Sequence, residues 1–275
     1  ETSGIDVNLG FKTDQSKDIS FQTNISFTTA DNLVKEIANG DKYIWGAGYG
    51  IPYNNLVRFQ EGESPGIFWG YLADGIFQNQ SEIDNHANQP NAQPGDIRFV
   101  DVNGDGVVNA DDRTKIGDPF GDFSIGWNLN LNVYNFDLSV TTYGLFGNDI
   151  FRGYERNLNY TNKPVSVLAR WTGEGTSNFE PRATFVDSNN NVRPSTRYVE
   201  DGSYFKIKNV QLGYNFNVAN SKVLDAVRLY LQGKNLMTFT DYTGYDPEMS
   251  YGVLDTGIDR GNYPSPRTVS VGLNV

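Results

Sequence analysis

The sequence predicts an all-β protein, an antiparallel transmembrane β-barrel with long extracellular loops. Three observations support this prediction. Long segments alternate apolar and polar residues with period two, the pattern of a strand with one apolar and one polar face. The polar positions are mainly Asn, Gln, Ser and Thr rather than Lys and Glu. Short turns alternate with long connections along the chain, as they do in outer-membrane barrels.

Seven segments carry the alternation, and several reach the roughly nine to eleven residues that a tilted strand needs to cross a bilayer. In chain order they are residues 5–11, 18–29, 123–133, 136–142, 205–216, 227–231 and 269–275. Residues 14–17 predict a hairpin turn between the first two, and Asn135 predicts a tight turn between the next two. The phase slips between Ile207 and Val210, which predicts a β-bulge.

Aromatic residues near the strand ends suit the two interfacial girdles of a membrane barrel. They are Phe11, Phe27, Tyr134, Tyr143, Tyr214 and Phe216. A soluble β-sandwich also alternates apolar and polar residues, and there the same aromatics are core or edge residues. Strand length and the uncharged polar face favour the barrel over the sandwich.

The connections over residues 30–65, 78–120, 147–198 and 240–266 are long and rich in Gly, Asn, Asp, Pro and aromatics. The 275 residues include 29 Gly and 11 Pro, which fits one large all-β domain with many turns. The net charge of −11 argues against nucleic acid as a partner, because phosphates need a basic surface. The chain has no cysteine, so thiolate and disulfide chemistry are excluded.

Residues 101–112 have the spacing of a calcium-binding loop. Position 6, where the backbone must turn sharply, is Gly106. The candidate Ca²⁺ ligands at positions 1, 3, 5, 7, 9 and 12 are Asp101, Asn103, Asp105, Val107 (through its carbonyl), Asn109 and Asp112. Position 12 has Asp where an EF-hand has Glu, and the loop resembles those of dockerin modules more than a sensor's. The alternative is an Asx-rich turn whose side chains hydrogen-bond their own backbone. We expect a structural calcium ion that holds a long loop in shape.

Catalysis has little support in the sequence, and we expect no enzyme activity. The one histidine, His86, lies in an Asn/Gln-rich stretch beside Asp84, with no nucleophile motif to accompany it. The chain has no Gly-x-Ser-x-Gly elbow, and nothing singles out a glycosidase carboxylate pair. A solvated loop residue is therefore the favoured interpretation of His86.

Four places in the sequence resemble the SusC/RagA-like family of TonB-dependent outer-membrane transporters. The first is Pro94-Gly95-Asp96-Ile97 running through the calcium-like loop to Ile116-Gly117. The second is Glu200-Asp201-Gly202-Ser203-Tyr204 with Lys208-Asn209-Val210 and Leu212-Gly213-Tyr214, and the third is Gly233-Lys234-Asn235-Leu236 with Tyr242 to Glu248. The fourth is Tyr263-Pro264-Ser265-Pro266-Arg267-Thr268. This ordered set covers nearly the whole chain.

The resemblance implies a 22-stranded barrel with an N-terminal plug, integral to the bacterial outer membrane, energised by a TonB complex and capped by a SusD-like surface lipoprotein. It implies import of oligosaccharides or peptides, by a dimer of transporter–lipoprotein pairs. Residues 1–275 are expected to be the C-terminal part of such a barrel, with the plug and first strands absent from this chain. Such barrels usually end on an aromatic residue, so we expect further residues after Val275.

Substrate recognition is expected to use aromatic platforms in the loops, because sugar rings and peptides both stack on aromatic faces. The candidates are Trp45, Tyr49, Tyr53, Tyr154, Tyr160, Trp171, Tyr242 and Tyr245. The alternative for each is packing between loops or contact with the capping lipoprotein.

Two other classes of protein remain open at this stage. A soluble, calcium-stabilised β-sandwich serving as a binding or adhesion module also accounts for the alternation and the Asx-rich loop. A small self-contained barrel of eight strands, acting as a pore or anchor, accounts for the strand lengths.

Overall fold

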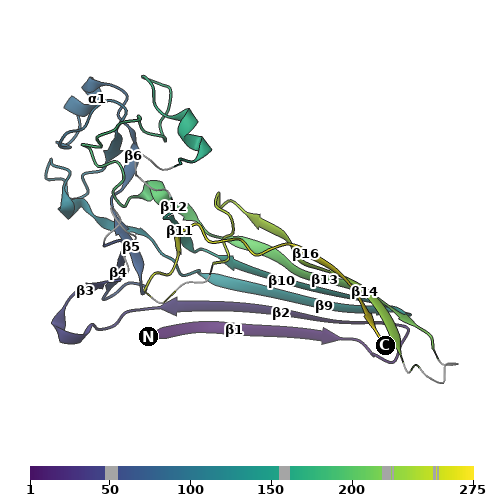
Figure 1. Cartoon of the computed structure of the whole chain (residues 1–275). Coiled ribbons are helices and arrows are strands. Elements are labelled where there is room, and N and C mark those ends of the chain that lie inside the picture. Colours follow the sequence, from purple (N-terminus) through teal and green to yellow (C-terminus); the bar gives the residue numbers. More distant parts are fainter. Residues whose placement is uncertain (47–54, 155–161, 219–223, 225, 250–251, 253) are drawn as a thin grey trace.

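The computed structural model describes residues 1–46, 55–154, 162–218, 224, 226–249, 252 and 254–275. Long antiparallel strands form one extended sheet, and the connections at one end of it fold into a separate mass of small sheets and loops (Figure 1). We call the extended sheet the wall sheet. We call the described residues of the connections over 33–122, 147–203 and 241–267 the loop region.

The wall sheet contains all seven predicted strands, which confirms the all-β antiparallel prediction. Its order is β1 (Thr2–Lys12), β2 (Ile19–Asn32), β9 (Phe123–Val133), β10 (Phe136–Phe146), β13 (Tyr204–Phe216), β14 (Val227–Thr240) and β16 (Thr268–Asn274). Every neighbouring pair is antiparallel. Within the described residues the sheet is open, with β1 and β16 at its edges.

One face of the wall sheet is apolar from edge to edge. The register places Leu131 of β9 opposite Phe21 of β2 and Leu138 of β10. The pattern continues to the edges, where Leu9 and Val271 are 66% and 73% exposed. A row of exposed apolar side chains across seven strands is the lipid-facing surface of a membrane barrel, whose opposite face is polar.

Aromatic residues form a band at each end of the apolar face. At the turn end, Phe136 contacts Tyr214, which contacts Phe216. At the loop end, Phe123 stacks between Phe27 and Phe146. Phe136 and Phe146 lie ten residues apart on β10. Ten residues span about 34 Å along a strand, or about 24–28 Å across a bilayer at a tilt of 35–45°. This height matches the apolar band of outer-membrane barrels.

The girdle prediction was wrong for Tyr143. It pairs with Gly126 and Lys206 on the polar face, where its ring lies 6.2 Å from the ring of Tyr204. The reason is parity: Phe136 and Phe146 hold the apolar face of β10, so odd-numbered positions of this strand face the other way. The bulge prediction was right, because the register shifts at Lys208.

Among the described residues, the loop region contains three small sheets and one short α-helix, α1 (Gln80–Asp84). The sheets are β3 (Tyr43–Trp45), β4 (Val57–Gln60), β5 (Ile67–Gly70) and β8 (Thr114–Gly117); β6 (Ala73–Ile76) and β7 (Ile97–Phe99); and β12 (Val199–Asp201), β11 (Asp149–Arg152) and β15 (Ile258–Asp259). The 3₁₀ turns are η1 (Ala38–Gly40), η2 (Ala110–Asp112), η3 (Val165–Ala169) and η4 (Thr196–Tyr198). No helix in the described ranges has the length and apolar character needed to cross a membrane.

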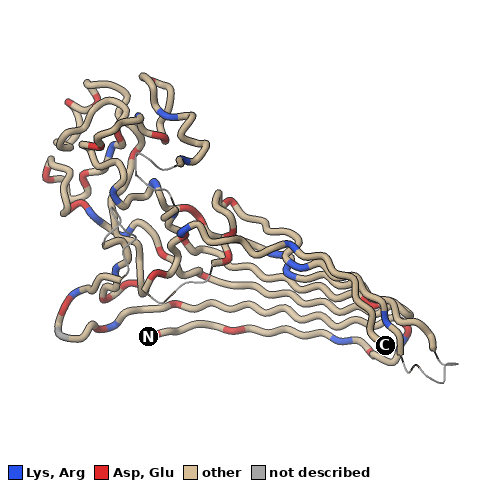
Figure 2. Tube along the Cα trace, in the orientation of Figure 1, with Lys and Arg blue, Asp and Glu red and all other residues tan. Residues whose placement is uncertain are grey.

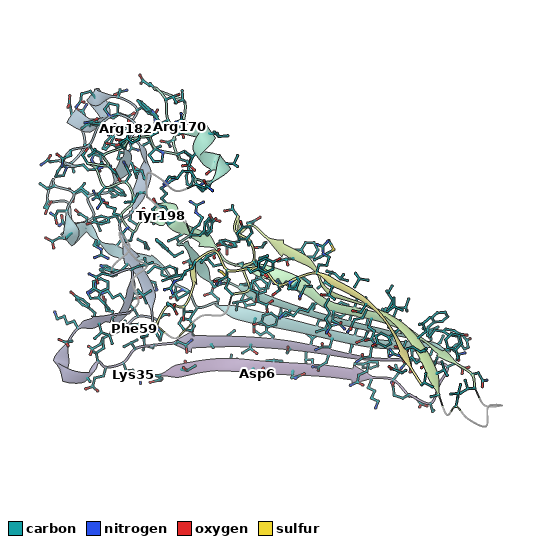
Figure 3. All side chains as sticks on the ribbon, in the orientation of Figure 1. Asp6, Lys35, Phe59, Arg170, Arg182 and Tyr198 are labelled. Atoms are coloured by element: carbon teal, nitrogen blue, oxygen red, sulfur yellow. The ribbon has the colours of Figure 1, made fainter. Side chains whose placement is uncertain are left out.

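The buried core of the structure lies in the loop region, not on the wall sheet. Phe68 of β5 and Phe151 of β11 meet edge to face with Tyr198 beside them, and none of the three is more than 4% exposed. Tyr198 lies between the wall sheet and the upper loops (Figure 3). Charged residues gather in the loop region and near the turn end, whereas the long strands carry few (Figure 2). The loop region thus has its own hydrophobic core and lies at one end of the wall sheet.

Candidate functional site

The first candidate site is an ion cluster where the polar face of the wall meets the loop region. Lys206 of β13 is 2% exposed, and its Nζ lies 2.6 Å from Asp246 Oδ1 and 3.0 Å from Glu248 Oε2. Lys208, the bulge residue, also pairs with Glu248 and lies over the ring of Tyr143. The two lysines therefore hold residues 246–248 against the polar face of the wall.

The cluster makes attachment of this loop sensitive to acid. Burial opposes ionisation of Glu248, but hydrogen bonds from Lys208 and Lys206 outweigh it and hold the pKa of Glu248 below its usual value. A lowered folded-state pKa stabilises the attached loop above the unfolded pKa of about 4.3. That stabilisation is lost as pH falls through the folded value.

We expect hydrogen exchange in residues 241–249 to rise as pH falls below about 4. Glu248→Gln should raise exchange there already at pH 7, because the ion pairs of Glu248 with Lys206 and Lys208 are gone. Glu36→Gln, a change at an exposed carboxylate, is the matched control. Exchange that is the same in all three proteins at pH 7, when corrected for intrinsic rates, would contradict the role given to Glu248.

A second polar network follows directly after β14. The hydroxyl of Tyr242 donates to Asp259 Oδ2 at 2.5 Å, and burial raises the pKa of Tyr242, so the phenol stays protonated as a donor. Glu200 accepts from the backbone N–H and hydroxyl of Thr243 and pairs with Arg152 at 3.0 Å. The segments around Glu200 and Tyr242, which carry the family resemblance, thus meet at the junction of wall and loops.

The predicted aromatic platforms lie in different surroundings. Tyr245 is 73% exposed, whereas Tyr242 is 5% exposed inside the junction network. Trp171 donates from Nε1 to Gln78 Oε1 and packs against Gly95, where a Cβ would come within 2.4 Å of its ring. Tyr154 is half-buried. Trp45 lies on β3, in an arginine–aromatic cluster with Arg58 and Arg113. Tyr49, Tyr53 and Tyr160 lie outside the described residues.

The calcium-like loop is closed by its own hydrogen bonds. Asp101 accepts from the N–H groups of Gly104 and Gly106 at 2.7 and 2.8 Å. The fully buried Asp112 accepts from Val102 and Asn109 at 2.8 and 2.7 Å. These are the backbone bonds of the Asx-turn alternative.

The donor set of this loop suits calcium in its chemistry, since all six candidate ligands supply oxygen. Carboxylate oxygens have lone pairs beyond those used by one N–H each. In the described part of the chain, however, no three carboxylate or imidazole groups lie close enough together to hold a metal ion. A calcium ion here would have to draw the carboxylates of Asp101, Asp105 and Asp112 inward.

The Pro94–Ile97 segment contains a buried carboxylate, Asp96, that binds a part of the chain distant in sequence. Asp96 is completely buried and pairs with Arg182 Nε at 2.7 Å. It also accepts from Asn191 Nδ2 at 3.1 Å and from the backbone N–H of Gln93 at 3.0 Å. Asn191 in turn accepts from the N–H of Ile97. These bonds dock the connection around residues 182–191 onto β7, at a distance in sequence of about 90 residues.

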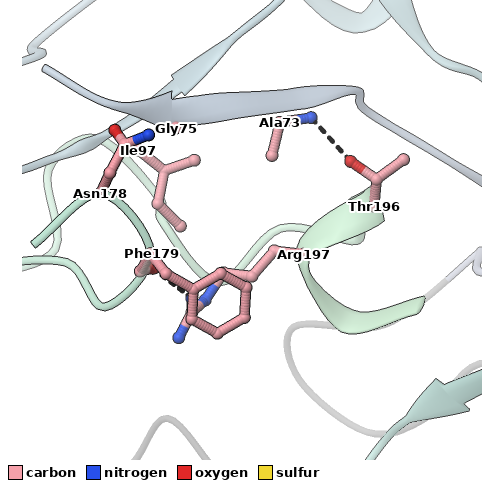
Figure 4. A pocket seen from close by; sticks show the side chains of 7 residues that line it. All are labelled: Ala73, Gly75, Ile97, Asn178, Phe179, Thr196 and Arg197. Carbon is pink, nitrogen blue, oxygen red and sulfur yellow. Dashed lines mark hydrogen bonds between the residues drawn. The ribbon is translucent and has the colours of Figure 1, made fainter. Parts of the chain in front are cut away.

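A small pocket lies beside β6, η4 and the segment at 178–179 (Figure 4). Its volume is about 160 Å³, and its lining residues are Ala73, Gly75, Ile97, Asn178, Phe179, Thr196 and Arg197. Arg197 is already paired with Glu180 at 2.7 Å, and Thr196 accepts from the N–H of Ala73. The pocket has room for one side chain or a few waters and is too small for an oligomer.

Sequence reasoning missed the arginine–aromatic cluster and the role of Lys206. The strands that bring Arg58 next to Trp45 and Trp69 are only four residues or shorter, so no alternation marks them. His86 packs its ring against Phe77 and bonds the carbonyl of Ala87, in keeping with a structural residue. It has no catalytic partner among the described residues.

The wall sheet, with its apolar face, aromatic bands and folded loop region, defines a segment of a large membrane β-barrel. Comparisons with known proteins agree. TonB-dependent receptor P3 of Formosa agariphila is 31% identical over the whole chain, which spans 28% of that relative. Receptor P26 of the same organism is 36% identical over 80% of the chain, or 23% of its own length. TonB-dependent receptor SusC of Bacteroides thetaiotaomicron is 26% identical over the whole chain, or 26% of its own length.

A solved structure of the RagAB peptide transporter matches 99% of the chain and 28% of the solved chain, with a TM-score of 0.76 at 19% sequence identity. This match concerns the fold. No family model matches the chain. The chain belongs to the family of TonB-dependent receptors, and SusC is among the relatives it resembles. It spans less than a third of the length of these relatives.

Proposed function

We propose that this chain is the C-terminal part of the barrel wall, with its extracellular loops, of a TonB-dependent nutrient importer in the bacterial outer membrane. The single observation that carries the proposal is the wall sheet: an apolar face bounded by two aromatic bands about one bilayer apart, backed by a polar face. The full-length identity of 31% to a TonB-dependent receptor supports the same function. The relatives are named as receptors and importers rather than enzymes.

The cargo of this importer is an oligomer, glycan or peptide, that is moved without chemical change. The similar RagAB proteins are described as a peptide importer. Exposed Tyr245 and the aromatic cluster around Trp45 suit either class, because both stack on aromatic faces. A SusD-like lipoprotein would cap the loop region, a TonB complex would act through the plug, and two such pairs would form a dimer.

The test begins with the native protein extracted from its membrane in mild detergent without proteolysis. The chain of 30.7 kDa spans 28% of receptor P3, so a parent protein of the same length as P3 would have a mass of 30.7 kDa divided by 0.28, or about 110 kDa. We expect that mass, a co-purifying lipidated subunit, and uptake of labelled oligomer that stops when the proton gradient is collapsed. A 30.7 kDa protein in the soluble fraction would overturn the proposal in favour of a binding module.

We also propose that residues 101–112 bind a structural calcium ion, on the strength of their oxygen-only donor set. Replacing Asp101 and Asp105 with Ala should abolish calcium binding and with it the rise in melting temperature that calcium gives the parent protein. Isothermal titration of the full-length protein with CaCl₂ measures the first effect. The Asp111→Ala variant changes a carboxylate outside the six ligand positions and is the matched control. Titration heat that is unchanged in the double variant would leave the Asx-turn interpretation in place.

A further inference from the structure

Two arginines and three aromatic rings form a cluster on the small sheet of β3, β4, β5 and β8. The guanidinium carbon of Arg58 lies 3.7 Å from the ring centroid of Tyr43 and 3.7 Å from that of Trp69. The guanidinium carbon of Arg113 lies 5.1 Å from the ring of Trp45. We call Arg58 and Arg113 the arginine pair.

The strand register builds this cluster. Trp45 of β3 is directly opposite Arg58 of β4, so their side chains share one face of the sheet, and Tyr43 is one step diagonal on that face. Arg58 pairs with Ile67 of β5, which places Trp69 one diagonal step away on the other side. Arg113 comes directly before β8 and donates to the carbonyls of Asn55 and Trp69 at 2.6 and 2.9 Å.

The positive charge of the arginine pair is not neutralised within the described residues. Neither guanidinium has a carboxylate within 4.0 Å there, whereas Arg98, Arg182 and Arg197 of the same loop region are each ion-paired. The Nε atoms of Arg58 and Arg113 are buried without a hydrogen-bond partner. Burial lowers the pKa of Arg58, Tyr43 raises it and Arg113 lowers it, so the two cations lie near enough to repel each other. Two adjacent unneutralised cations are unexpected in a chain of net charge −11.

The stacking also fixes how Arg58 can bind. Tyr43 and Trp69 both lie 3.7 Å from its guanidinium carbon and come from the strands on either side of β4. We infer that the two rings cover the two faces of the guanidinium, which leaves its edge to donate. A guanidinium held in one plane is preorganised for a two-pronged contact with a carboxylate, sulfate or phosphate group. Rings beside it offer an apolar surface for the body of the same ligand.

We propose that the arginine pair, with Tyr43, Trp45 and Trp69, binds an oxyanion group carried by the imported oligomer. The cargo is therefore an acidic oligomer, rather than a neutral one. The identity of the ligand as cargo rests on the proposed import function, whereas anion binding by this cluster does not. The alternative is a purely structural role, in which the two arginines stabilise the four-stranded sheet and bind no ligand.

The test measures direct binding to the full-length protein in detergent by isothermal titration, at fixed ionic strength. The glycan probes are a galacturonic acid tetramer and the neutral galactose tetramer. The peptide probes are a glutamate-containing pentapeptide and its glutamine counterpart. We expect at least one acidic probe to bind about tenfold or more tightly than its neutral partner, as one charge-assisted hydrogen bond would give.

Arg58→Gln should abolish this preference for the acidic probe. Arg58→Lys, which keeps the charge but not the planar fork, should retain only part of it and guards against loss of folding in the Gln variant. Arg98→Gln is the matched control, since it removes the same charge from an arginine already paired with Asp74. It should leave the preference unchanged.

Equal affinity for acidic and neutral probes of both kinds in the parent protein would overturn the proposal. So would an equal loss of preference in Arg58→Gln and Arg98→Gln, because the general field of the loop region would then explain the binding. Absence of uptake with anion binding intact would count against import and not against the site.

Discussion

Leu129→Arg is expected to destabilise the assembled protein by about 2–4 kcal/mol, the cost of an arginine at the lipid-facing midplane of a barrel. Leu129 lies near the middle of the membrane span of β9, opposite Thr23 of β2 and Val140 of β10 on the apolar face. In a membrane this side chain contacts hydrocarbon, where a guanidinium loses its water. The measurement is the unfolding midpoint of the detergent-solubilised protein, together with the amount assembled in the outer membrane.

Asn130→Arg, one residue later on β9, is the matched control. Asn130 is opposite Gln22 and Ser139 on the polar face and is exposed there. An arginine at this position reaches the aqueous side of the wall, so we expect a change within about 0.5 kcal/mol. If the two substitutions have equal effects, the two faces do not differ in solvent, and the assignment of the apolar face to lipid would be wrong.

The strands of the wall sheet could be predicted from sequence because successive side chains point to opposite faces of the sheet, and the two faces have different surroundings. Phe123 to Val133 alternate without a break, since one face of β9 meets lipid and the other meets water. The same rule located the bulge, where the alternation slips near Lys208. Tyr143 was misplaced because its nearness to a strand end was weighed above its parity.

The loop region was beyond this kind of prediction. Its core joins Leu56, Phe68, Phe151 and Ile258, which lie up to about 200 residues apart on strands of two to four residues or in connections. Such strands are too short to show a period, and their partners are set by tertiary contacts. The arginine pair could not be predicted for the same reason. The aromatic rings around Arg58 come from neighbouring strands, and only the strand register shows that they lie beside it.

The family resemblance supplied part of what periodicity could not. Its segments at Pro94–Ile97, Glu200–Tyr204 and Tyr242–Glu248 were recognised as motifs, with no indication of what they do. In the structure they are anchoring points: Asp96 holds a distant connection, Glu200 holds Thr243, and Glu248 holds two wall lysines. Buried or half-buried charges with several partners fix one arrangement of the long connections above the wall.

Among these anchoring residues, we expect Asp96 to contribute most. Asp96→Ala should destabilise the docking of residues 182–191 onto β7 by about 3–5 kcal/mol. The substitution leaves Arg182 without its carboxylate and removes the acceptor used by Asn191 and the N–H of Gln93. Because these bonds join connections about 90 residues apart, the loss is local to the docked segment. Hydrogen exchange over residues 171–193 measures it.

Asp74→Ala is the matched control, because it removes a carboxylate that is also paired with an arginine, at 3.0 Å, but is 64% exposed. Exposed ion pairs contribute at most about 1 kcal/mol, so exchange over the same segment should hardly change. Burial and the further hydrogen bonds from Asn191 and Gln93, not the presence of an ion pair, distinguish Asp96 from Asp74. Equal exchange in the two variants would mean that the connection is held by apolar contacts such as Trp171 on Gly95, with the buried carboxylate contributing little.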